Sequence, residues 1–266
     1  MINKLHLKLI LISIILLDSL HAAPMSFQDI VIVEISAKDL GLKIKSESAY
    51  HKNPKHRTQF RQANIEFLRE AIPRARFIFI DMWYPDLLEN DTDTALSEVL
   101  RTGKNLTLSG IGNFEGKTEL THPLFKGSVA EVGHIFFYND NPKLFQFPPI
   151  LCSDPQFQLH QIEQCPENAK IRHVAIIAAE GYLDKRLKHE KKGTYDVPKS
   201  AFSRFLRISL AEFKADPDYI NDKLVILINK PLPHMDVHKT IKNKKLTGSE
   251  IIAEMILIFA NNLATE

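Results

Sequence analysis

The chain has 266 residues, 44% of them hydrophobic, and its 34 Lys and Arg residues nearly balance its 32 Asp and Glu residues. This composition excludes an intrinsically disordered chain, because such chains are poor in apolar residues and usually carry a large net charge. The net charge of +2 gives no broad electrostatic attraction to phosphates, so we expect no nucleic-acid partner.

The N-terminal segment has the three parts of a secretory signal peptide. Lys4 and Lys8 precede an apolar run, Leu9–Leu17, and Ala22 is the small residue expected at a cleavage site. We therefore predict that residues 1–22 are a signal peptide and that the protein is periplasmic or secreted. The alternative is an uncleaved segment that anchors the protein in the inner membrane. No later apolar run approaches the roughly 20 residues needed to span a bilayer, so we expect no transmembrane helix in the mature chain.

The first half of the mature chain alternates between strand and helix patterns. Short apolar or β-branched runs predict strands, and apolar residues spaced for one face of a helix predict helices. The predicted strands are Ile30–Ile35, Arg76–Asp81 and Asn105–Ser109, and the predicted helices are Lys55–Ala71 and Thr92–Arg101. This β-α-β-α-β order favours a parallel sheet with right-handed crossovers.

The second half is predicted to add a hairpin, two helices and a further buried strand. The hairpin joins His134–Tyr138 to Leu144–Ile150 through a turn at 139–142; the remaining elements are a long helix at Lys170–His189, a mixed segment at Phe202–Phe213, a strand at Lys223–Asn229 and a helix at Gly248–Leu263. No linker-like stretch divides the chain. We therefore predict one α/β domain over residues 23–266, with a mostly parallel central sheet flanked by helices and an antiparallel hairpin insertion.

The two cysteines of the chain, Cys152 and Cys165, lie close together in sequence. In an oxidising compartment such a pair favours a disulfide that closes a short loop. The alternative is two unrelated buried thiols, which the spacing leaves open.

A first candidate site is an acidic cluster at the end of the second predicted strand. Asp81 ends that strand, and Asp86, Glu89, Asp91 and Asp93 follow within twelve residues. Ligand sites in α/β sheets lie beyond the carboxyl ends of the strands, and carboxylates there bind ligands or a divalent cation. Alternatively, Asp91 and Asp93 stabilise a helix start and Asp81 binds backbone in a turn.

A second candidate site lies near the C-terminus. If the segment is extended, His234, Asp236 and His238 lie on one side of the chain, and two imidazoles with a carboxylate suit a transition metal. The alternative is an ordinary polar loop. Asp236 joins Asp81, Asp86 and Asp91 as a candidate ligand-binding residue. The sequence lacks phosphate-binding loops and a nucleophile elbow, so it identifies no cofactor and no catalytic residue.

Five groups of residues, in order between Gln28 and Leu263, have the pattern of a known family. They are Ile30–Ile35; Phe77–Asp81 with Asp91, Asp93, Ala95 and Leu96; Gly133–Ile135 with Asn139 and Asp140; Ile208–Phe213 before Lys223–Ile228; and Asp236 with Thr240 before Gly248–Ile251 and Ala253. Together these groups resemble the type-two CHASE domain, an extracytoplasmic sensor of bacterial adenylate cyclases, histidine kinases and related receptors.

This resemblance implies a sensor without catalytic activity of its own, which binds a small ligand or a membrane receptor, kinase or cyclase. Two residues depart from the family pattern: Asn229 replaces the usual glycine, and Ile252 replaces a frequent histidine. Family members usually continue into transmembrane helices and an output domain, whereas this sequence stops at Glu266, directly after the sensor-like helix. We therefore expect a free-standing sensor module here. The alternative hypothesis is a metal-dependent hydrolase that uses the acidic and histidine clusters.

Overall fold

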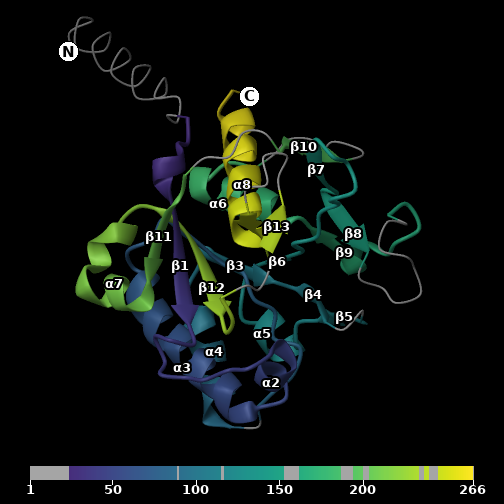
Figure 1. The fold of residues 1–266 in the computed structure, drawn as a ribbon. Helices are drawn as coiled ribbons and strands as arrows, with labels where there is room; N and C mark the ends of the chain where they lie inside the picture. Colours follow the sequence, from purple (N-terminus) through teal and green to yellow (C-terminus); the bar gives the residue numbers. More distant parts are fainter. Residues whose placement is uncertain are drawn as a thin grey trace, which may run out of the picture.

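The computed structural model describes residues 24–88, 90–114, 117–152, 162–186, 194–199, 204–233, 237–239 and 245–265. The predicted signal peptide, residues 1–22, lies outside the described residues. A six-stranded parallel sheet forms the centre of the described chain, as the sequence predicts (Figure 1). In spatial order its strands are β11 (Leu206–Ser209), β1 (Ile30–Ser36), β12 (Leu224–Lys230), β2 (Phe77–Ile80), β3 (Leu106–Ser109) and β6 (Val132–Gly133).

Helices cover both faces of this sheet. One face packs against α3 (Pro54–Ala71), α4 (Asp91–Thr102), α5 (Pro123–Lys126) and α7 (Leu210–Ala215), with α2 (Glu47–His51) beside α3. The other face packs against α6 (Val174–Leu183) and α8 (Gly248–Thr265), which lie against each other. Single 3-10 turns lie at Phe27–Asp29, Glu167–Ala169 and Pro217–Ile220.

The central strands are apolar along their length because both of their faces are buried. In β1, Ile30 and Ile32 belong to the core beneath α6 and α8, whereas Val31 and Val33 belong to the core beneath α3 and α4. Successive side chains of a strand point to opposite faces. A strand buried on both faces therefore has a continuous apolar run rather than an alternating pattern.

The described residues also form four antiparallel strand pairs outside the main sheet. They are β4 (Ile111–Phe114) with β5 (Lys117–Leu120), β7 (Leu144–Phe147) with β10 (Tyr195–Pro198), β8 (Ile150–Cys152) with β9 (Lys170–Arg172), and β13 (Val237–Lys239) with β14 (Lys245–Thr247). The predicted antiparallel insertion is thus present, but its partners differ. Tyr138 and Gln146 form a single bridge, whereas β7 takes its main partner from β10.

The predicted long helix at Lys170–His189 is wrong at both ends. Lys170–Arg172 forms β9 because its backbone pairs with β8, and His173 then caps α6 by accepting a hydrogen bond from the backbone N–H of Ala175, at 3.1 Å. At the other end Asp184 has a left-handed backbone conformation, with φ of 51°. This conformation ends the helix.

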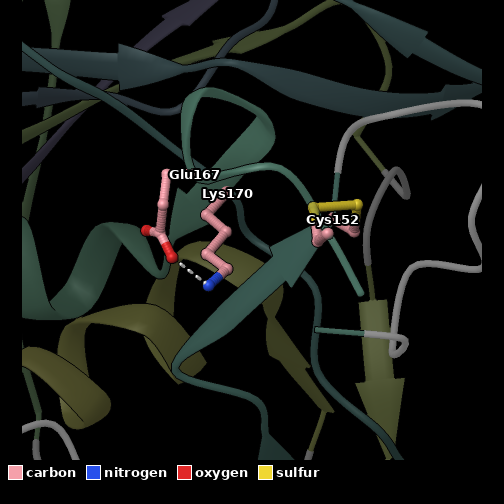
Figure 2. Close-up of a disulfide and its surroundings, with 4 residues drawn as sticks. Cys152, Glu167 and Lys170 are labelled. Carbon is pink, nitrogen blue, oxygen red and sulfur yellow. Dashed lines mark hydrogen bonds and ion pairs between the residues drawn. A yellow bond between two sulfur atoms is a disulfide. The ribbon is translucent and has the colours of Figure 1, made fainter. Parts of the chain in front are cut away.

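The predicted disulfide between Cys152 and Cys165 is present (Figure 2). It joins the end of β8 to the turn before β9, with Cα atoms 5.8 Å apart. Near it, Lys170 of β9 forms an ion pair with Glu167, at 2.5 Å. Both cysteines are buried, and the cross-link ties the end of β8 to the turn that leads into β9.

Candidate functional site

A cleft with a volume of about 910 Å³ opens in the described chain at the carboxyl ends of β2 and β12. These two strands are neighbours in the sheet, but the chain after β2 enters α4 on one face and the chain after β12 leads to α8 on the other. Such a switch point leaves a crevice between the two connections, where α/β proteins bind their ligands.

The floor of the cleft includes Asp81, the residue directly after β2. Its carboxylate accepts a hydrogen bond from the Ser249 hydroxyl, at 2.9 Å between Oγ and Oδ2. Ser249 belongs to the first turn of α8, so this bond connects the second strand of the chain to the last described helix across the cleft. The Asp81 carboxylate is thus positioned between the sheet and α8.

The start of α8 is held by a reciprocal cap. The Glu250 carboxylate accepts a hydrogen bond from the Thr247 backbone N–H at 2.8 Å, and the Thr247 hydroxyl accepts one from the Glu250 N–H at 3.3 Å. Arg207 of β11 pairs with Glu250 at 3.2 Å and with Glu34 of β1. Lys230 of β12 also lies 3.4 Å from Glu34. This network fixes α8 against three strands of the sheet.

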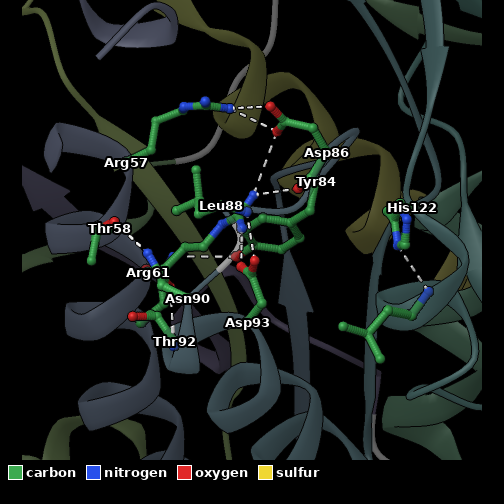
Figure 3. Close-up of polar contacts among 12 residues, drawn as sticks. Arg57, Thr58, Arg61, Tyr84, Asp86, Leu88, Asn90, Thr92, Asp93 and His122 are labelled. Carbon is green, nitrogen blue, oxygen red and sulfur yellow. Dashed lines mark hydrogen bonds and ion pairs between the residues drawn. The ribbon is translucent and has the colours of Figure 1, made fainter. Parts of the chain in front are cut away.

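Two arginines of α3 hold the segment that follows β2 (Figure 3). Arg57 donates to both carboxylate oxygens of Asp86, at 2.7 and 2.5 Å. Arg61 forms a buried ion pair with Asp93 and donates to the Asp86 backbone carbonyl at 2.8 Å. The second Asp93 oxygen accepts from the Leu88 N–H at 2.5 Å. Asp93 therefore has a structural role in fixing one wall of the cleft.

Aromatic side chains line the cleft from two parts of the chain. His51 of α2 lies between Tyr50 and Trp83, in ring contact with each, and Phe137 lies beside His238 of β13. Burial raises the pKa of the Tyr50 hydroxyl to about 12, and the nearby arginines oppose this increase only in part. Tyr50 is therefore a neutral hydrogen-bonding group at physiological pH.

A buried histidine pair lies next to the cleft. His134 directly precedes the segment that lines it, and its ring centroid is 4.7 Å from that of His173, the cap of α6, at an interplanar angle of 89°. Neither side chain is exposed to solvent. Burial lowers the pKa of His173 to about 3, and burial together with the neighbouring His173 ring lowers the pKa of His134 well below its usual value. Both rings are therefore neutral at physiological pH.

The structure brings together only some of the residues predicted from the sequence. Asp81, Asp86 and His238 line the same cleft. Asp91 lies outside it, exposed in the first turn of α4, where it favours the helix start. Glu89, His234 and Asp236 lie outside the described residues. Within the described ranges, no group of three or more His, Cys, Asp or Glu side chains is placed to hold a metal ion.

Sequence patterns alone did not point to several residues of the cleft. Trp83 is the third residue after β2 and Asn229 is the penultimate residue of β12, so the rule that selected Asp81 extends to both positions. Arg57 and Ser249 come from helices, and their place in the cleft depends on how α3 and α8 pack on the sheet. Among the described helices, none has the length and apolar character required to cross a membrane.

The described chain is thus an α/β fold with a cleft at the carboxyl ends of two neighbouring strands of its parallel sheet. Comparison with protein-family models, with curated proteins and with solved structures gave no match to this chain.

Proposed function

We propose that the protein is an exported sensor module, as its resemblance to the type-two CHASE domain implies, and that its ligand binds in the cleft between β2 and β12. Its signalling partner would be a membrane receptor, histidine kinase or cyclase. The Cys152–Cys165 disulfide supports a location outside the cytoplasm, because disulfides persist mainly in oxidising compartments.

The observation that carries this proposal is the link between the cleft and α8. The Asp81 carboxylate on the cleft floor binds Ser249 in the first turn of that helix. A ligand that hydrogen-bonds to Asp81 would compete with Ser249 and so change the contacts of α8. Binding in the cleft would thereby change how α8 packs against the sheet.

Binding can be tested with thermal unfolding and intrinsic fluorescence. A ligand that binds the native state raises the unfolding temperature, and a change in emission localises binding to the cleft because Trp83 is the only tryptophan of the chain and lines it. We expect at least one compound from a broad panel of sugars, amino acids, nucleosides, organic acids and metal ions to change both signals. If no compound changes either signal, the proposal is refuted.

A metal-dependent hydrolase remains the alternative proposal, because Asp81 and His238 line the same cleft. It predicts that a divalent cation raises the unfolding temperature and that Asp81→Ala abolishes this increase. Asp91→Ala is the matched control, since Asp91 is a carboxylate of the same predicted cluster outside the cleft. No response to Mg²⁺, Mn²⁺, Ca²⁺ or Zn²⁺ would count against the hydrolase.

A further inference from the structure

The charged side chains of the cleft are largely paired with one another or with close neighbours. Arg57 binds Asp86, Arg61 binds Asp93, and Lys230 lies 3.4 Å from Glu34. Of these pairs, Arg61–Asp93 is buried, and an ionic ligand that displaced one of its partners would leave a buried charge unpaired, which is strongly destabilising. The arrangement therefore favours an uncharged ligand.

Polar atoms without partners show what such a ligand must offer. The Trp83 Nε1 and Arg57 Nε donors and the Asn229 Oδ1 acceptor are buried, and none has a hydrogen-bond partner among the described residues. All three side chains line the cleft. A buried polar group without a partner is costly, so the ligand must supply both acceptors and donors. A hydroxyl group does both, since it donates one hydrogen bond and accepts others.

The aromatic rings along the cleft distinguish between flat and puckered ligands. The rings of His51 and Trp83 are inclined by 37°, those of Tyr50 and His51 by 71°, and those of Phe137 and His238 by 67°. These inclined neighbours do not form a parallel slot for a flat ring system. They instead offer separate faces on which the apolar C–H groups of a puckered ring can pack.

From these three observations we infer that the ligand of the cleft is a neutral sugar. This inference rests on the proposed ligand-sensing function and specifies its ligand class. The sugar hydroxyls satisfy Trp83, Arg57 and Asn229, the C–H faces pack on the inclined rings, and the paired charges stay in place. The cleft volume of about 910 Å³ falls within the range of pockets that hold small organic molecules.

The experiment compares ligand classes on the full-length protein. Glucose, galactose, mannose, N-acetylglucosamine, ribose and maltose are titrated up to about 10 mM, which covers weak specific binding, with Trp83 emission and thermal unfolding as readouts. Adenosine, phenylalanine and glutamate represent flat heteroaromatic, aromatic zwitterionic and anionic ligands. We expect at least one sugar to change both signals and the other classes to change neither.

Two variants then test the site by calorimetric titration of the responding sugar. Asn229→Leu removes the unpaired Oδ1 acceptor, together with the hydrogen bond between this side chain and Tyr50, and should weaken binding about tenfold, the effect of one lost buried hydrogen bond. Asn261→Leu is the matched control, because Asn261 Oδ1 is also buried and without a partner among the described residues but lies outside the cleft. Asn261 is twelve residues beyond Ser249 along α8, about 18 Å further along the helix. Trp83→Phe should also weaken binding and provides a second test if Asn229→Leu folds poorly.

The outcomes separate this inference from the proposed function. If a non-sugar compound binds with a change in Trp83 emission and no sugar does, the sugar inference is wrong and the sensing function stands. If a sugar binds equally well to the wild type, Asn229→Leu and Trp83→Phe, it does not bind in this cleft and the inference is again wrong. If no compound of any class binds, both the inference and the proposed function are refuted.

Discussion

Lowering the pH from 7 to 5 should destabilise the protein through its buried histidine pair. The folded state keeps His173 neutral with a pKa of about 3, whereas an unperturbed histidine has a pKa of 6.5. As the pH falls below 6.5, the unfolded chain takes up a proton that the folded protein does not. The contribution of the neutral His173 to the free energy of unfolding is therefore fully present above pH 6.5 and is lost progressively as the pH falls toward 3.

The magnitude follows from these two pKa values. A pH of 5 lies about 1.5 units below the histidine pKa of the unfolded chain, and each unit corresponds to about 1.36 kcal/mol. His173 alone therefore removes about 2 kcal/mol from the free energy of unfolding at pH 5. His134 adds a loss of the same sign, because its pKa is lowered as well. The assay is urea denaturation followed by circular dichroism at pH 7, 6 and 5.

Two asparagine variants separate this effect from general acid sensitivity. His173→Asn removes the titrating ring but keeps a good helix cap, so it should reduce the loss between pH 7 and 5 by about 2 kcal/mol. His122→Asn is the matched control, because His122 likewise caps a helix, α5, but is only partly buried. An equal loss of stability in His173→Asn and the wild type would refute the reasoning.

Three further predictions concern stability, each measured by chemical denaturation at pH 7. Arg61→Met should destabilise the protein by about 3–5 kcal/mol because it leaves Asp93 buried without its partner. The control Arg74→Met, at an exposed ion pair, should change stability by less than about 1 kcal/mol. Equal effects of the two variants would contradict this account. Replacing both cysteines by alanine should cost about 3 kcal/mol, the effect of opening a short loop, and no loss would show that the cross-link is dispensable. Gly181→Ala should cost about 1–3 kcal/mol by overpacking, since its Cβ would lie 2.0 Å from the Phe77 ring, and an unchanged midpoint would show that Phe77 moves freely.

The sequence predicted the central elements well because their signals are local. β2 and β12 are apolar runs buried on both faces, and α3 shows one apolar stripe that ends near Pro73. The helix predicted at Lys170–His189 failed because β9 takes its conformation from pairing with β8. That partner is about 20 residues away and leaves no local pattern.

The candidate site was only partly predictable for a similar reason. Asp81 could be found because the carboxyl end of a parallel strand is a recognisable position. Trp83 and Asn229 also lie near the carboxyl ends of β2 and β12, but their meeting in one cleft depends on β12 lying between β1 and β2. Ser249 reaches Asp81 over 168 residues of chain, and no pattern within either segment indicates that contact.

The position of β12 also determines the order in which this protein can fold. β1 and β2 do not pair with each other; each pairs with β12, which begins nearly 150 residues after β2. During synthesis the first two central strands therefore remain without their shared neighbour until most of the chain has emerged. Such long-range pairing slows folding and exposes apolar strands to aggregation in the meantime. Truncated chains that end before Lys223 lack β12 and should consequently aggregate unless a chaperone binds them.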